Sequence, residues 1–107
     1  LKQLGPDHLD VASTFYNIGS VHFKKDDYDQ ALEFFQKSLT IRLKQLGPDH
    51  PLVASTFHTI AFLYKAKKDL LKAKEYWEKA YAIFSRDFGP NHPNTKLVKG
   101  QLDALKN

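Results

Sequence analysis

The chain has 107 residues, of which 42% are hydrophobic, so it is long enough for one domain with a buried core. It contains no cysteine, which excludes a disulfide framework, thiolate metal sites and thiol chemistry. Its net charge of +4 favours acidic partners through long-range attraction.

One short motif recurs along the chain at a fixed interval. It is Leu4-Gly5-Pro6-Asp7-His8, which returns as Leu46-Gly47-Pro48-Asp49-His50 and again as Phe88-Gly89-Pro90-Asn91-His92, a period of 42 residues. A fixed period with Gly-Pro at the same point is typical of stacked-repeat proteins. Because Leu1-Lys2-Gln3-Leu4 matches the end of the following copy, we expect the sequence to be a fragment of a longer array.

The first repeat has the pattern of a helical hairpin. From 8 to 25, apolar residues recur at the i, i+3, i+4 and i+7 spacing of an amphipathic helix, and Asp7 is placed to act as its N-cap. A second helix is expected from about 28 to 45, where Asp26-Asp27 can cap its start. Gly47 can then adopt the left-handed conformation and Pro48 prevents continuation.

The second repeat copies this pattern, and a third copy stops after its first helix. That last helix is more polar, and Gly100 weakens it by ~1 kcal/mol relative to alanine. A polar outer face is typical of a terminal capping helix. At the other end, Phe15, Phe34 and Phe35 are expected to be partly bare, which favours self-association of the chain.

The helical positions resemble the tetratricopeptide repeat, which places a large residue, a Leu-Gly or Leu-Ala pair and an aromatic on helix A, then Ala, an aromatic and a second small residue on helix B. The matching positions are Phe15, Ile18-Gly19, His22, Ala31, Phe35 and Ser38 in repeat one, and Phe57, Ile60-Ala61, Tyr64, Ala73, Trp77 and Ala80 in repeat two. The 42-residue period is similar to the kinesin-light-chain-like subclass. Trp77 is interpreted as a core residue and His22 as a buried, hydrogen-bonded imidazole.

This resemblance implies an all-α fold of about two and a half repeats, with five helices in hairpins stacked into a right-handed superhelix. The expected boundaries are a single array fragment at 1–107, repeat one at 5–46, repeat two at 47–88 and the capping helix at 91–106. The family implies that the A helices line a concave groove that binds a peptide. The sequence has no Gly-rich phosphate loop, HExxH or similar catalytic motif, so we expect that the chain is not an enzyme.

Carrying the repeat register over gives the residues expected to line that groove. Asn side chains can grip a peptide backbone and Lys can meet carboxylates, while aromatic residues supply apolar anchors. We therefore predict a site for an acidic peptide, with no cofactor, formed by Tyr16, Asn17, Ser20, Phe23, Lys24, His58, Thr59, Phe62, Lys65 and Gln101.

Other functions are disfavoured by specific features. His8, His50 and His92 are separated by whole repeats, so we interpret them as junction residues near helix starts and not as metal ligands. The chain has only two arginines, and its lysines are interspersed with acidic residues. A nucleic-acid binder is expected to cluster Arg and Lys, so this pattern argues against nucleic-acid binding. No stretch is long and uncharged enough to span a membrane, and we expect a soluble, cytoplasmic protein. The second hypothesis is a structural module whose exposed repeat ends form homo-oligomers or exchange helices.

Overall fold

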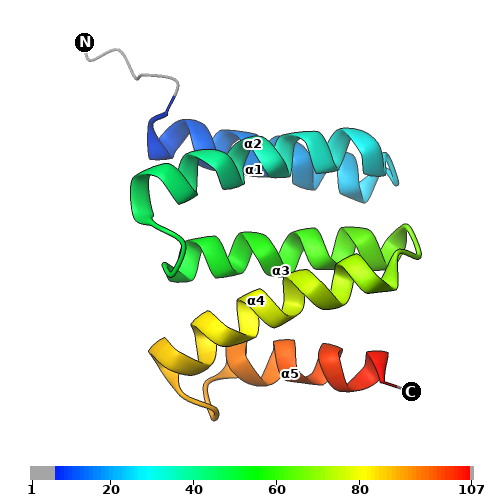
Figure 1. Ribbon diagram of the computed structural model, residues 1–107. Helices are drawn as coiled ribbons and strands as arrows, with labels where there is room; N and C mark the ends of the chain where they lie inside the picture. Colours follow the sequence, from blue (N-terminus) through cyan, green and yellow to red (C-terminus); the bar gives the residue numbers. More distant parts are fainter. Residues whose placement is uncertain (1–6, 107) are drawn as a thin grey trace. The chain divides into compact units, whose positions relative to one another are not determined.

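The computed structural model describes residues 7–106, which form five α-helices (Figure 1). The helices are α1 (Leu9–Lys24), α2 (Tyr28–Leu46), α3 (Pro51–Ala66), α4 (Leu70–Phe88) and α5 (Pro93–Leu105). The predicted all-α class and its five helices are confirmed. The chain divides into two compact units, Leu1–Pro48 and Asp49–Asn107.

The first unit is a hairpin in which α1 packs along α2. Its core depends on a close approach between the helices, since a Cβ atom added at Gly19 would lie 2.8 Å from the Phe35 ring and 3.2 Å from the Ala31 carbonyl oxygen. Phe35 is completely buried. The prediction that Phe35 is exposed at the open end of the array was therefore wrong. Gly19, which lies opposite the Phe35 ring, leaves room for the ring to pack between the two helices.

The second unit contains the α3–α4 hairpin and α5, which packs on α4. Trp77, Ile60 and Leu63 are completely buried in it. Trp77 is thus a core residue, as the sequence predicts. From α5 only Thr95 and Val98 are buried, so the last helix presents mostly polar side chains to its surroundings.

The N-cap residues of the three A helices, α1, α3 and α5, are histidines and not aspartates. The Nδ1 atoms of His8, His50 and His92 accept hydrogen bonds from backbone amides two residues further on, at 3.0, 3.0 and 3.1 Å. These bonds satisfy an amide that the helix itself leaves unpaired. The interpretation of the histidines as junction residues is confirmed, whereas the N-cap role predicted for Asp7 was wrong.

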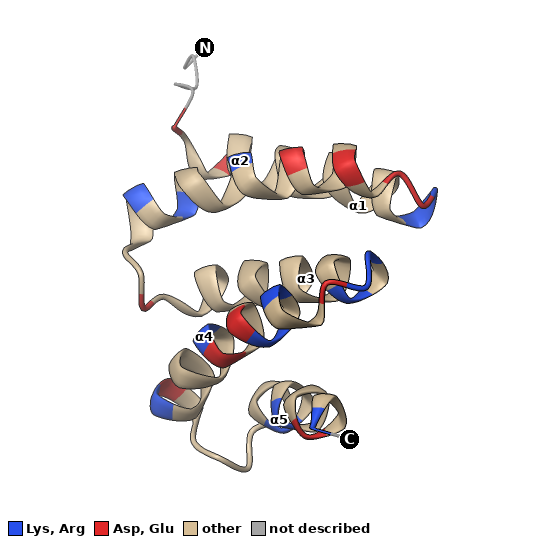
Figure 2. Ribbon diagram, turned by 45° about the vertical axis from the view of Figure 1, so that its right-hand side comes forward, with Lys and Arg blue, Asp and Glu red and all other residues tan. Residues whose placement is uncertain are grey.

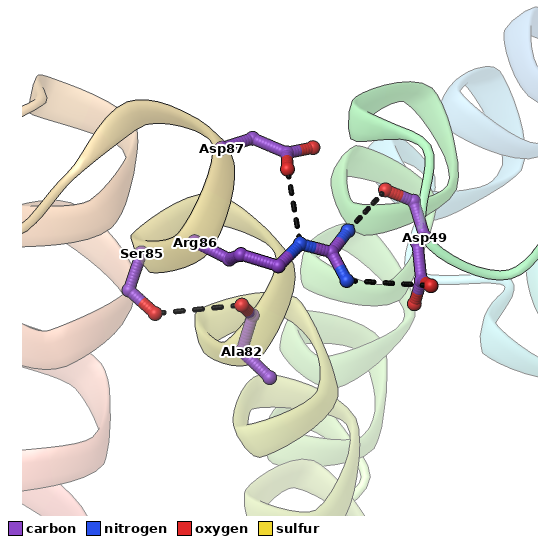
Figure 3. Close-up of polar contacts among 5 residues, drawn as sticks. All are labelled: Asp49, Ala82, Ser85, Arg86 and Asp87. Atoms are coloured by element: carbon purple, nitrogen blue, oxygen red, sulfur yellow. Dashed lines mark hydrogen bonds and ion pairs between the residues drawn. The ribbon is translucent and has the colours of Figure 1, made fainter.

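Asp7 and its counterpart Asp49 instead form ion pairs with the last turn of the B helix in the same unit. Asp7 pairs with Lys44, and Asp49 pairs with Arg86. The Arg86 guanidinium lies 3.3 Å from the Asp49 carboxylate, 3.1 Å from the Asp49 carbonyl oxygen and 3.1 Å from the Asp87 carboxylate. Figure 3 shows these three contacts as dashed lines. Since these groups are largely exposed, the pairs orient the junction more than they stabilise it.

The turns between paired helices also differ from expectation. Asp69 accepts a hydrogen bond from the Lys72 amide at 3.2 Å and caps α4. The side chain of Asp27 makes no such bond at the start of α2, and its carboxylate lies 3.2 Å from His22 Nδ1. The His22 side chain is 30% exposed and stacks on Phe34, so the predicted buried imidazole is only half-buried.

Candidate functional site

The outer faces of α1 and α3 carry few charges. In α1 the charged residues are Asp10 and Lys24, and in α3 the only one is Lys65. Figure 2 shows blue and red segments alternating along α4, whereas α3 is tan until its C-terminal end. Helices α1 and α3 therefore each present a surface with few charges and a lysine near the C-terminal end, next to the aromatic and polar side chains predicted to bind a ligand.

In the first unit, the predicted site residues surround an open hollow. Ser20, Phe23 and Lys24, with Asp26 from the following turn, line a space of about 410 Å³. The Phe23 ring meets Tyr28 edge-on at a centroid distance of 5.7 Å, which fixes one wall. The Ser20 hydroxyl donates to the Tyr16 carbonyl oxygen at 3.0 Å. Its donor is therefore already used, and the main contribution of Ser20 to the hollow is its small size.

Tyr16 and Asn17 lie on the same helix, in different surroundings. Tyr16 is half-buried, with its ring 5.3 Å from Phe35, and the buried Arg42 guanidinium lies 5.1 Å above the Tyr16 ring. Burial lowers the pKa of Arg42, which the nearby Tyr16 partly offsets. Asn17 is exposed, so its amide is open to a ligand. Sequence reasoning missed Arg42, because nothing in its spacing indicates that a cation lies behind the face.

In the second unit, three aromatic side chains form one cluster. Phe62 meets His58 edge-on at 4.8 Å and Trp77 at 5.1 Å. The Trp77 Nε1–H group donates a hydrogen bond of 2.8 Å to His58 Nδ1. Phe62 and His58 are half-buried above the completely buried Trp77, so the indole forms the floor of this part of the site.

The hydrogen bond from Trp77 defines the state of His58. An indole N–H can only donate, so His58 Nδ1 must accept and the imidazole proton must be on Nε2. Burial lowers the pKa of His58, which keeps the ring neutral at physiological pH. The sequence identified both residues but not their contact, which joins α3 to α4 across 19 positions.

A second polar contact joins α3 to α5. Lys65 Nζ donates to Gln101 Oε1 at 3.2 Å, and the same ammonium group lies 6.0 Å from the centre of the Trp77 ring. Two residues predicted from the register alone therefore lie together beside the aromatic cluster. Thr59 is half-buried and its hydroxyl donates to the Ser55 carbonyl oxygen at 3.1 Å. Its methyl group is therefore the part of the side chain that would contact a ligand.

Neither metal binding nor membrane insertion finds support among residues 7–106. No group of three or more His, Asp or Glu side chains in this part of the chain could hold a metal ion. None of the described helices is both long and apolar enough to cross a bilayer.

The paired helices and their uncharged A-helix faces define a helical-hairpin repeat protein. The model of the tetratricopeptide repeat family matches residues 10–69 and 52–102. The chain therefore belongs to the tetratricopeptide repeat family. Modules of this family are generally protein-interaction scaffolds and are typically not catalytic.

Solved structures show the same fold. The crystal structure of BtubC (BKLC) from P. vanneervenii superposes with a TM-score of 0.84 and 21% identity, covering 98% of this chain and 41% of that one. Kinesin-light-chain TPR-like repeats from Podosopora anserina give a TM-score of 0.78 at 21% identity, covering 97% of this chain and 49% of that one. This chain thus spans less than half of either relative. A search of curated protein sequences gave no significant match.

Proposed function

We propose that this chain is a protein-interaction scaffold that binds a peptide segment containing acidic residues on the exposed faces of its A helices. The observation that carries this proposal is the Lys65–Gln101 contact beside His58 and Phe62. It joins a cation, an amide and an apolar anchor on one surface, which is the combination that an acidic peptide with one aromatic or aliphatic residue requires.

The first unit supports the same function with a different shape. The hollow at Ser20, Phe23 and Lys24 has room for a ligand side chain, and Lys24 is an exposed cation at its edge. Asn17, one turn away, offers a donor and an acceptor to a peptide bond. We propose that both faces contribute to peptide binding in a protein of the cytoplasm, in the groove implied by the family.

The experiment is a screen of acidic, aromatic-containing peptides read out by intrinsic fluorescence. Trp77 is the only tryptophan and forms the floor beneath Phe62, so its emission reports directly on ligand binding at this face. Replacing Asn17, Lys24 and Lys65 together by alanine is expected to weaken binding at least about tenfold. Unchanged affinity in that triple variant would exclude the A-helix faces as the site.

Lys79 provides a matched control for Lys65. Its ammonium group also lies over aromatic rings, 5.6 Å from the centre of Phe57 and 5.3 Å from that of Tyr76, but outside the proposed site. Lys79→Ala removes the same charge and the same kind of contact. We expect Lys65→Ala to weaken the peptide complex and Lys79→Ala to leave it unchanged.

The second candidate function, self-association through an open repeat end, rests on Phe15 and Phe34. Both are half-buried, with ring centroids 6.0 Å apart, whereas Phe35 no longer contributes because it is buried. Light scattering over a range of concentrations decides between the two functions. A monomer at high concentration excludes self-association, and a dimer abolished by Phe34→Ser would establish it.

A further inference from the structure

A second surface, outside the proposed peptide site, lies where α4 packs on α5. A hollow of about 170 Å³ there is lined by Lys74, Glu78, Tyr81, Lys99, Leu102, Asp103 and Lys106. This volume is well below the ~300 Å³ at which sites for whole small molecules begin, and suits one large side chain. It therefore fits a protein segment that inserts a single residue.

The repeat register shows what normally covers this face of an A helix. In the first unit, Phe15 and His22 of α1 lie against Phe34 of α2, with ring centroids 6.0 and 5.7 Å apart. In the second unit, the equivalent Phe57 and Tyr64 of α3 lie against Tyr76 of α4, at 5.8 and 5.6 Å. In each hairpin an aromatic residue of the B helix contacts two rings of the A helix.

On α5 and at its C-cap these two ring positions are occupied by lysines. The residues 42 positions after Phe57 and Tyr64 are Lys99 and Lys106, and Leu102 and Asp103 lie between them. Lys99 pairs with Asp103 at 3.2 Å, so these two charges compensate each other, while Lys106 has no ion-pair partner among residues 7–106. A partner helix that packs on this face of α5 therefore needs carboxylates at the positions where α2 and α4 carry Phe34 and Tyr76.

The side of α4 that borders the hollow also differs from the equivalent side of α2. Residues Leu71, Lys74, Glu78 and Tyr81 follow one face of α4, whereas their counterparts on α2 are Asp29, Leu32, Gln36 and Leu39. The apolar Leu32 is thus replaced by Lys74. Tyr81 is half-buried, and Leu71, which is 84% exposed, extends the apolar part of the face beyond the hollow.

We propose that the α4–α5 groove docks an amphipathic helix of a partner protein in the position of a B helix. This partner helix carries acidic residues that meet Lys74, Lys99 and Lys106, and one large apolar residue that fills the hollow between Tyr81 and Leu102. Because Lys99 and Asp103 compensate each other, Lys74 and Lys106 against Glu78 leave the groove with an excess of positive charge, which favours an acidic partner. The docking follows the general helix-in-groove mode, with the apolar side chain as anchor.

The test uses two synthetic helical probes of about 15 residues, a length at which alanine-rich helices become stable in water. One has a leucine spine flanked by glutamates, and the other has lysine at every glutamate position. Titration into the isotope-labelled chain is followed by amide chemical shifts. The glutamate probe is expected to shift the amides of Lys74, Tyr81, Leu102 and Lys106, and the lysine probe is expected to leave them in place.

Charge reversal within the groove provides the matched variants. Lys106→Glu is expected to weaken the glutamate probe about fivefold, because an attractive exposed pair becomes repulsive. Lys79→Glu makes the same change in net charge on another side of α4 and is expected to change affinity less than twofold. Circular dichroism confirms that both variants remain helical.

Three results would overturn the proposal: equal binding of both probes, shifts confined to α1 and α3, or equal effects of Lys106→Glu and Lys79→Glu. Concentration-dependent shifts of the same α4–α5 amides without any probe would identify a second copy of the chain as the occupant, which also contradicts it. Lys65→Ala is expected to leave the probe-induced shifts of the α4–α5 amides unaffected, so this readout is independent of the proposed peptide site.

Discussion

The α1–α2 and α3–α4 hairpins are copies that keep their internal contacts and differ on their outer faces. Both have a histidine cap, an acid–base pair at the helix junction and a lysine over two aromatic rings, Lys37 in one and Lys79 in the other. At the A-helix face, Tyr16 corresponds to His58 and Ser20 to Phe62. The comparison separates residues that build a hairpin from residues that give each face its own surface.

The exchange of Ser20 for Phe62 has the clearest consequence. Serine leaves the hollow of about 410 Å³ in the first unit, whereas the Phe62 ring packs on Trp77 in the second. The first face therefore has an open hollow, and the second has an aromatic surface. Substitutions that copy a residue from one hairpin into the other test which differences the fold tolerates.

The largest effect is expected from Gly19→Ala, which copies Ala61. The new Cβ would lie 2.8 Å from the Phe35 ring, so the helices must separate, and the free energy of unfolding should fall by about 2 kcal/mol. Urea unfolding measures this loss. Gly100→Ala is the control, because no atom lies within 4 Å of its added Cβ, and it should gain up to ~1 kcal/mol. A Gly19→Ala variant as stable as the parent would show that the close approach of the helices is not required.

A smaller, stabilising effect is expected from Ser38→Ala, which copies Ala80. Ser38 is completely buried and its hydroxyl has no hydrogen-bond partner among residues 7–106, so its removal should raise the free energy of unfolding by about 1 kcal/mol. Thermal unfolding measures the gain. Thr95→Val, which copies Val53, removes another unpartnered buried hydroxyl and should act in the same direction. A loss of stability in both variants would mean that these hydroxyls bind ordered water.

Lys68→Asn should stabilise the second hairpin by about 0.5 kcal/mol, because Lys68 has a φ of +67° and asparagine tolerates the left-handed region better. The counterpart Asp26, with a φ of +62°, already has a suitable side chain, so Asp26→Asn should be close to neutral. Chemical denaturation of both variants checks the difference. Equal gains at the two turns would contradict a conformational origin.

The smallest effect is expected on the pH dependence of stability, from His58→Tyr, which copies Tyr16. Burial lowers the pKa of His58 below 6.5, so the unfolded chain binds a proton more readily than the folded one. The stability that this group contributes is fully present above pH 6.5 and is lost as the pH falls towards the folded-state pKa. Melting temperatures between pH 7.5 and 5 should fall less steeply in the variant. Identical slopes would show that His58 does not contribute.

Some site residues could be predicted from the sequence, and others could not. The 42-residue period placed Lys65 and Gln101 on equivalent helices, and the structure brings their side chains within 3.2 Å. The same reasoning gave Asp7 a capping role that belongs to His8, because aspartate and histidine both stand before the helix and only geometry decides which reaches the amide. The peptide site and the repeat boundaries stay predictions.

The sequence by itself determined the helices, their pairing and the family, because apolar periodicity and glycine–proline junctions act over short distances along the chain. Only the tertiary structure decided that Phe35 is buried, that Trp77 donates to His58 and that α5 presents lysines where α1 and α3 present rings to their B helices. Burial and hydrogen-bond partners depend on which side chains from distant helices occupy the same space. That information arises only when the helices pack.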